Sequence, residues 1–295
     1  MLGASVAGRL RRSLGPVEVR RDDRILDEYV RKPPSPQLAV DLFDDEWASW
    51  IPDGSRGSVH AGVTPLFDDP RLRWAESVFG GFEGMRALEL GPLEGGHSFM
   101  LDRGGAASVD AIEANTRAYL KCLVVKELVG MDRVRFHLGD FMPYVCDPDE
   151  LTASWLGVET GFDLAVASGV LYHMQEPVEL LAGLSGLADR LFIWTHYFDQ
   201  ERIDQLVEND RKFGSVESRT HEGFEYSSAV QYYGPTLATA GFCGGPEHQS
   251  RWLTRDSLLG VLRHVGYEDV RIGFDEPNHQ NGPAMAICAS RTPLD

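Results

Sequence analysis

The chain has 295 residues, of which 43% are hydrophobic and 25% charged, a composition typical of a soluble globular protein. Its formal net charge of −17 argues against a long polyanion such as a nucleic acid as the substrate, because proteins that bind nucleic acids carry basic patches. The sequence has no run of about 18 apolar residues, so no transmembrane helix is predicted. Its four cysteines are scattered and form no CxxC pair, which argues against a zinc site or a disulfide framework and favours a reducing cytoplasm.

Residues 1–70 are predicted to form an N-terminal arm and cap ahead of the main domain. The arm carries eight basic residues between Arg9 and Lys32, and the stretch RKPPSPQ is rich in helix breakers. The arm lacks an apolar segment adequate for a secretory signal, so we expect it to lie on the surface. The two tryptophans of EWASWIP are expected to pack the cap on the core, and the cap is a candidate contact in a homodimer.

The main domain, residues 71–295, alternates between strand-like and helix-like patterns. A helix with Pro in its first turn is predicted within residues 68–82, at the start of this domain. Strands are then predicted at 85–91, 107–114, 133–140, 162–173 and 190–197, and helices at 95–103, 115–130 and 177–188. Such alternation implies βαβ units and a parallel sheet with both faces covered.

Residues 199–250 interrupt this alternation. The segment is polar at first and then rich in Tyr and Gly, and it is predicted to be an insertion that acts as a lid. A helix at 254–267 and strands at 268–276 and 282–290 follow, and the two strands are expected to form an antiparallel hairpin. The predicted fold is therefore α/β: a Rossmann-like, seven-stranded, mostly parallel sheet with helices on both faces, plus the cap and the lid insertion.

The stretch ALELGPLEGGHSFML, residues 87–101, joins the first strand to the next helix through a glycine-rich turn. Such a turn lets the backbone approach a nucleotide closely at the carboxyl edge of the sheet. A dinucleotide site favours G-x-G-x-x-G, whereas here Leu93 stands between Gly91 and Gly95. Two carboxylates, Glu89 and Glu94, would face a pyrophosphate, so the turn better suits a ligand with a cationic amino acid end.

The segment ELGPLEG resembles the first motif of the class I S-adenosylmethionine (SAM)-dependent methyltransferases, E/D-x-G-x-G-x-G, with Leu93 at the central glycine. The resemblance extends in order over roughly residues 72–290. It implies SAM as the cofactor. In this family an acid at the second strand end, here Glu113, accepts both ribose hydroxyls, for which two carboxylate oxygens are suited. The resemblance implies these cofactor-binding residues: Glu89, Gly91, Gly95, Glu113, Asp140 and Phe141 beside adenine, and Ser168 on the methionine side.

The run GVLYH after the fourth strand, together with AYLKCLVVKELVG, is similar to a narrower subgroup. This subgroup carboxymethylates the wobble uridine of bacterial tRNA with carboxy-SAM. Small-molecule methyltransferases share the GVLYH run, and no basic surface of the kind that tRNA binding requires is evident in the sequence. Both acceptor classes therefore stay open at this point, with nucleic acid the less favoured.

Three residues after the fourth and fifth strands are candidates for the chemistry. Methyl transfer from a sulfonium needs in-line positioning in a dry site, and an oxygen acceptor gains from a general base, most often His. His173 is the first candidate, and His196 and Tyr197 in WTHYF are expected on the substrate side. A structural histidine bonded to the backbone is the alternative for His173. No metal site is predicted.

The sequence thus predicts a cytoplasmic SAM-dependent methyltransferase whose acceptor is a hydroxyl of a small molecule, such as a sugar or natural product. A methyl- or carboxymethyltransferase of tRNA, a non-catalytic scaffold with the same fold, and an NAD-dependent oxidoreductase are the alternatives. The identity of the acceptor, the choice among O-, N- and C-methylation, and the oligomeric state are not predicted from the sequence.

Overall fold

A computed structural model of the chain describes residues 29–54, 57–147, 161–205, 212–234, 244–245 and 247–294. Most of the basic arm and Cys243 lie outside these residues. Among the described residues, no helix has both the length and the apolar character that crossing a membrane requires.

The predicted seven-stranded sheet is confirmed, in the order β3-β2-β1-β4-β5-β10-β9. The first five strands are parallel, and β10 runs antiparallel to both β5 and β9. The strands are β1 (Arg86–Leu90), β2 (Ser108–Glu113), β3 (Val134–Leu138), β4 (Phe162–Ser168), β5 (Ala188–His196), β9 (Asp269–Glu276) and β10 (Ala284–Ser290). The strand order reverses between β1 and β4, which is where ligands bind in open α/β sheets.

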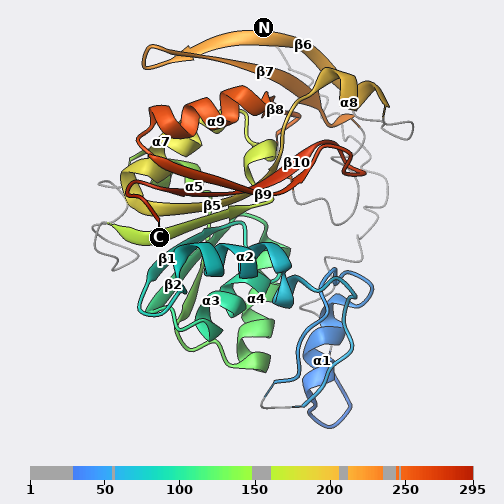
Figure 1. Ribbon diagram of the computed structural model, residues 1–295. Coiled ribbons are helices and arrows are strands. Elements are labelled where there is room, and N and C mark those ends of the chain that lie inside the picture. Colours follow the sequence, from blue (N-terminus) through green and yellow to red (C-terminus); the bar gives the residue numbers. More distant parts are fainter. Residues whose placement is uncertain are drawn as a thin grey trace, which may run out of the picture.

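Helices cover both faces of this sheet, as Figure 1 shows. One face packs against α2 (Pro70–Phe79), α3 (Gly96–Arg103) and α4 (Thr116–Val129), and the other against α5 (Phe141–Cys146), α7 (Pro177–Leu187) and α9 (Arg255–His264). Side chains alternate along each buried strand. In β5, for example, Phe192 packs in the hydrophobic cluster under α2, α3 and α4, whereas Leu191 and Ile193 pack in the cluster under α5, α7 and α9.

The fourth strand is shorter than predicted. It ends at Ser168 because Gly169 takes a left-handed conformation, with φ of 81°. The residues that follow form a 3₁₀ turn, η4 (Leu171–His173), and not a continuation of the strand. The chain therefore turns across the carboxyl edge of the sheet, which brings Tyr172 and His173 next to the end of β5.

The insertion contains the short helix α8 (Gln200–Gln205) and a second sheet that the sequence analysis did not predict. The strands β6 (Lys212–His221), β7 (Phe224–Tyr232) and β8 (Gln249–Leu253) pair antiparallel, and β6 and β7 meet at Glu222 and Gly223 with φ of 46° and 84°. This sheet lies over α9 in Figure 1, and β8 is joined to η4 by a hydrogen bond from the Arg251 N–H to the Met174 carbonyl, 2.8 Å. The insertion thus forms a folded wall beside the end of β4.

The N-terminal cap consists of α1 (Pro36–Val40), η2 (Asp41–Phe43), η3 (Leu66–Asp68) and connecting loops. It docks on the side of α4 and reaches the turn after β1 (Figure 1). Of the two tryptophans of EWASWIP, Trp47 packs against the core as predicted, whereas Trp50 is 45% exposed, so the prediction is wrong for Trp50. The Trp47 indole N–H donates to the Val40 carbonyl at 2.9 Å, and the Lys121 ammonium lies 5.2 Å from its ring centroid.

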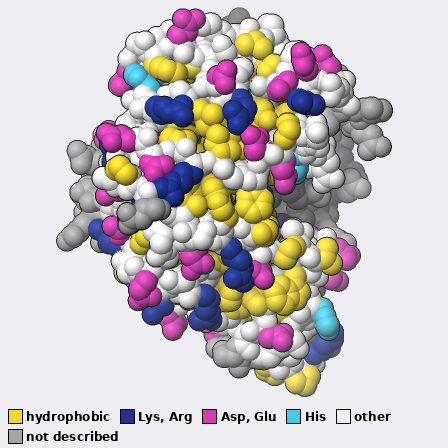
Figure 2. Space-filling model, viewed as in Figure 1, with side chains coloured by type: hydrophobic (Ala, Val, Ile, Leu, Met, Phe, Trp, Pro, Cys, Tyr) yellow, Lys and Arg dark blue, Asp and Glu magenta, His cyan; other side chains and the backbone are white. Residues whose placement is uncertain are grey.

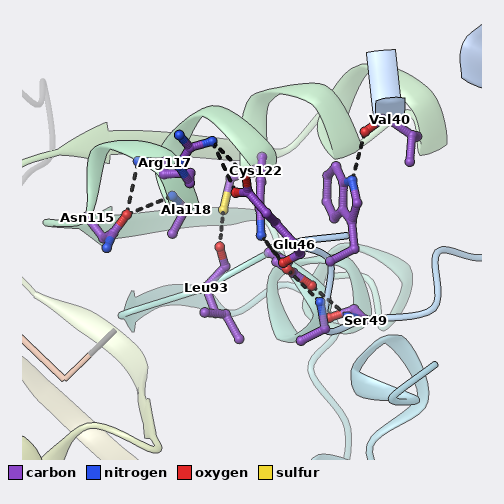
Figure 3. Close-up of polar contacts among 12 residues, drawn as sticks. Val40, Glu46, Ser49, Leu93, Asn115, Arg117, Ala118 and Cys122 are labelled. Carbon is purple, nitrogen blue, oxygen red and sulfur yellow. Dashed lines mark hydrogen bonds and ion pairs between the residues drawn. The ribbon is translucent and has the colours of Figure 1, made fainter. Parts of the chain in front are cut away.

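A buried ion pair fastens the cap. Figure 3 shows polar contacts of the same region, with Glu46 and Ser49 of the cap and Arg117 of α4 labelled. Glu94, in the glycine turn, is 1% exposed, and its carboxylate lies 3.0 Å from the Lys121 ammonium of α4, which is 9% exposed. The same carboxylate accepts the backbone N–H groups of Ala48 and Ser49 at 3.0 and 2.7 Å. Lys121 also donates to the Glu46 carbonyl, so a single pair of charges holds turn, helix and cap together.

Replacing Lys121→Met should lower the free energy of unfolding by about 3–5 kcal/mol, because the Glu94 charge would remain buried without its partner. The double variant Glu94→Gln/Lys121→Met should lose less than Lys121→Met alone, since it leaves no unpaired charge. Urea denaturation of the wild type, the single variants Lys121→Met and Glu94→Gln, and the double variant measures both effects. A double variant as unstable as the sum of the two single variants would contradict this account.

Candidate functional site

The turn after β1 places three residues in the left-handed backbone region. Gly91, Leu93 and Gly95 have φ of 61°, 57° and 80°. A Cβ on Gly91 would lie 3.2 Å from the Val170 side chain, and one on Gly95 would lie 3.2 Å from the Phe136 ring. Leu93 therefore adopts the backbone conformation that its motif position requires, although it lacks the freedom of glycine.

Glu113 ends β2 beside this turn. Its carboxylate accepts the Leu93 N–H at 3.1 Å and the Asn115 N–H at 2.8 Å, one on each oxygen. The side chain is 8% exposed, and burial raises the pKa of Glu113, although these backbone hydrogen bonds favour its charged form. Each oxygen keeps a further lone pair, so the carboxylate can accept two more donors, such as the hydroxyls of a vicinal diol.

The two other acids of the motif face different surroundings. Glu89 is buried under the turn, where it accepts the Ser98 hydroxyl of α3, and burial raises the pKa of its carboxyl. Glu94 binds the backbone of the cap and the Lys121 ammonium. The expectation that both acids would face a bound ligand is therefore wrong for Glu94, because its carboxylate is fully engaged in docking the cap.

The ends of β3 and β4 supply the remaining residues predicted for the cofactor. Asp140 is exposed and caps α5 by accepting the Met142 N–H at 2.9 Å. Phe141 is buried in the hydrophobic cluster of α5 and α7, so its side chain is directed into the core and only its backbone lies at the edge. Ser168 is half-buried at the end of β4. The structure thus brings the ends of β1 to β4 to one edge of the sheet.

An aromatic cluster lies at the ends of β4 and β5. Tyr172 is at its centre, with ring centroids 4.2 Å from His173, 4.7 Å from His196 and 6.0 Å from Trp252. Trp252 comes from β8 of the insertion and stacks on His196, with centroids 4.9 Å apart and planes 6° apart. The sequence analysis missed Trp252, because nothing along the chain relates it to a residue 56 positions earlier.

The two predicted histidines are held differently. His196 is buried, and its Nδ1 lies 2.9 Å from the Gly282 carbonyl and 3.2 Å from the Pro283 carbonyl. These acceptors assign a proton to Nδ1 and fix the orientation of the ring. The Nδ1 of His173 lies 2.7 Å from the Tyr233 hydroxyl, just after β7.

Tyr197 lies apart from this cluster. The alternation of side chains along the chain turns it to the face opposite His196, where it is buried in the hydrophobic cluster with α9. Burial raises the pKa of its phenol. Tyr197 is therefore not brought next to the histidines.

No group of three or more His, Cys, Asp or Glu side chains that could hold a metal ion occurs among the described residues. Asp199, Glu201 and Asp204, which follow His196 closely along the chain, therefore form no such group with it.

Leu93→Val should lower the free energy of unfolding by about 2 kcal/mol relative to Leu93→Gly, because a β-branched residue is strongly disfavoured at positive φ. Leu93→Asn, which tolerates this conformation, should resemble Leu93→Gly. Urea denaturation of the three variants tests this order. Equal stability of the Val and Gly variants would show that the turn does not require the left-handed conformation.

Comparison with known proteins identifies the fold. No family model and no curated protein matches the chain. The N-terminal domain of EvdMO1, crystallised in the presence of S-adenosylhomocysteine (SAH) and D-fucose, is 21% identical with a TM-score of 0.61, over 87% of this chain and 95% of that one. The same domain with SAH bound is 22% identical with a TM-score of 0.61, over 86% of this chain and 94% of that one.

A SAM-dependent methyltransferase from Mesorhizobium loti is 13% identical with a TM-score of 0.50, over 77% of this chain and all of that one. None of these three structures is named as a tRNA-modifying enzyme, so the narrower resemblance is not confirmed. Together with the strand order and the glycine turn, they show that this chain has the fold of the class I SAM-dependent methyltransferases.

Proposed function

We propose that the protein binds SAM and transfers its methyl group to a hydroxyl of a small molecule, such as a sugar or natural product. The observation that carries this proposal is the Glu113 carboxylate, which two backbone N–H groups hold at the end of β2 beside the turn. The turn supports the proposal as well, since Gly91 and Gly95 give it the left-handed backbone of a glycine-rich nucleotide-binding turn.

The residues present would bind SAM along the carboxyl edge of the sheet. Glu113 would accept the ribose hydroxyls, the backbone of the turn and Ser168 would line the methionine side, and Asp140 with the Phe141 backbone would meet adenine. When bound, SAM supplies a methyl on a sulfonium: a C–O bond forms to the acceptor, the C–S bond breaks, and SAH and a proton remain.

A general base can take up that proton, and His196 is our first candidate for this role. Its Nδ1 lies within hydrogen-bond distance of two backbone carbonyls, which fixes the orientation of the ring beside Tyr172 and Trp252. His173 is the second candidate base, and its hydrogen bond with Tyr233 ties it to the insertion. The surrounding aromatic rings exclude water, which favours methyl transfer.

Two further observations support a small acceptor. The EvdMO1 domain was crystallised in the presence of D-fucose, which supports a sugar hydroxyl. Among the described residues on the face in Figure 2, basic side chains are scattered between acidic ones and form no continuous stripe. A polyanion such as tRNA would need such a stripe.

Calorimetric titration with SAH tests the cofactor site. Glu113→Ala should weaken SAH binding by more than about tenfold, or roughly 2 kcal/mol, because the diol loses its acceptors. Glu113→Gln, which keeps one acceptor oxygen, should lie between Glu113→Ala and the wild type. No binding by the wild type would overturn the proposed function.

The same titration should depend on pH. Because the pKa of Glu113 is raised, SAH affinity should fall as the pH drops through that pKa, when the carboxylate gains a proton. The stability of the free protein should change in the opposite direction. Because the pKa of Glu113 is higher in the folded than in the unfolded state, this group favours folding at low pH, and that contribution is lost as the pH rises. Glu113→Gln should remove both effects. An unchanged pH dependence in Glu113→Gln would assign it to another group.

His196→Asn should lower kcat for methyl transfer by about 10²-fold or more and leave SAH affinity within about threefold, as expected for loss of a general base. His173→Asn and Tyr197→Phe are the comparison variants, and Tyr197→Phe should retain near-wild-type kcat. Single-turnover rates with a radiolabelled methyl group separate chemistry from product release. A larger loss in His173→Asn than in His196→Asn would reassign the base.

A further inference from the structure

A cavity of about 300 Å³ lies beside the aromatic cluster, on the face of the sheet that α2 and α3 cover. Its walls come from three parts of the chain: the cap loop at residues 64–66, the start of α2, and the hairpin of β9 and β10. Trp194 of β5 lines it from the sheet. The volume is at the small end of the range for ligand sites, roughly 300–1,000 Å³, and suits one or two rings.

The guanidinium of Arg71, which lines this cavity, is paired with a carboxylate of the protein itself. Arg71 binds the Asp69 carboxylate through Nε, at 2.9 and 3.1 Å, and through Nη2, at 2.5 Å. Burial would raise the pKa of Asp69, but hydrogen bonds from His97 and Arg71 outweigh it and hold that pKa well below its usual range. The guanidinium also lies over the Trp194 ring, 4.4 Å from its centroid. Arg71 is thus a fixed wall and not a free counter-ion for an anionic ligand.

The remaining formal charge on the cavity wall is negative. The ionisable lining residues are Asp69, Arg71, Glu276 and His279. Once Asp69 and Arg71 are paired, Glu276 leaves the wall with a net negative charge when His279 is neutral. A carboxylate or phosphate on the ligand would be repelled here, whereas hydroxyl groups can donate to Glu276.

A bulge in β9 turns an aromatic side chain toward this cavity. Between Gly273 and Glu276 the strand has one residue more than β10 has between Ala286 and Ala284, and Phe274 takes φ of 47°. Gly273 faces Trp74 of α2, and regular alternation would turn the next side chain, Phe274, to the other face of the sheet. Instead Phe274 itself contacts Trp74, with centroids 6.2 Å apart, and lines the cavity with 37% of its surface exposed.

This conformation is strained for a phenylalanine, and such strain persists where the surrounding structure requires the side chain in that place. The bulge shifts an apolar ring from one face of the sheet to the other, next to Glu276. An aromatic face beside a carboxylate is the combination that accommodates a ring with an apolar face and hydroxyl groups.

The cavity also adjoins the proposed base. Trp194 and His279 both line it, and their ring centroids lie 5.1 and 5.2 Å from that of His196. On its other side, Asp69 lies 2.9 Å from His97, at the start of the helix that follows the glycine turn. Residues that line the cavity therefore contact both the proposed base and the helix that follows the glycine turn.

We propose that this cavity holds the methyl acceptor and selects a neutral polyhydroxylated ring, such as a hexopyranose, over an anionic one. Phe274 packs against the apolar face of the ring, and Glu276 accepts its hydroxyls and repels carboxylates and phosphates. This inference rests on the proposed function.

The test is a saturation-transfer-difference NMR titration of the full chain saturated with SAH. D-Galactose and D-galacturonate are the matched probes, because they differ at C6 alone, where one has a hydroxymethyl group and the other a carboxylate. The variants are Phe274→Leu and Glu276→Gln. Glu268→Gln, an exposed acid at the start of the same hairpin and outside the cavity, is the control.

D-Galactose should bind about tenfold or more tightly than D-galacturonate, Phe274→Leu should weaken D-galactose binding about fivefold, and Glu276→Gln should reduce the discrimination to about threefold or less. SAH affinity and the control should stay within about twofold of the wild type. Equal binding of the two probes, or cavity variants without effect, would overturn the inference. A loss of SAH affinity in the cavity variants would assign the cavity to the cofactor and overturn it too.

The two proposals fail separately. A wild type that does not bind SAH would overturn the proposed function. A wild type that binds SAH but not D-galactose would leave the proposed function in place and overturn only the acceptor inference.

Discussion

The buried pair of Glu94 and Lys121 is the contact on which the arrangement of the site depends. Glu94 follows Leu93, and both lie in a turn whose backbone would otherwise have many conformations. With its carboxylate bound to the cap and to α4, the turn is fixed on one side, and the Leu93 N–H is directed at Glu113 on the other. A left-handed leucine is tolerated there because these contacts outweigh its backbone penalty of about 1–2 kcal/mol.

A second constraint is that distant segments complete the proposed acceptor side. The sheet supplies Trp194 and His196 and the turn η4 supplies Tyr172, but the insertion contributes Trp252, and the β9–β10 hairpin contributes His279. The insertion and the hairpin each pack on helices of the main domain and present these aromatic side chains at the edge of the sheet. The cofactor side is built by the ends of neighbouring parallel strands, whereas the acceptor side is built by additions to that framework, which is how one fold serves many substrates.

Electrostatics separates the two sides in a consistent way. On the proposed cofactor side, backbone N–H groups hold the Glu113 carboxylate in place, where it can accept the hydroxyls of the cofactor. On the acceptor side, Asp69 neutralises Arg71 and Glu276 remains. A net charge of −17 over the whole chain is consistent with both, since neither a cationic cofactor nor a neutral acceptor needs a basic surface.

The sequence alone was sufficient for the order along the chain of the seven strands of the main sheet and for the glycine turn, because apolar runs, caps such as Asn115 and glycines at strand ends are local signals. It also indicated Glu113, through the resemblance to the SAM-dependent methyltransferases, which have an acid at the end of the second strand. It predicted neither the short helix α5 nor the three-stranded sheet of the insertion. The tertiary structure alone decided that Glu94 docks the cap, that Phe141 points into the core, and that Trp252, His279 and Phe274 border the site. These positions depend on contacts between segments far apart in the chain and on one extra residue in β9, which reverses the face of a side chain without changing any local pattern.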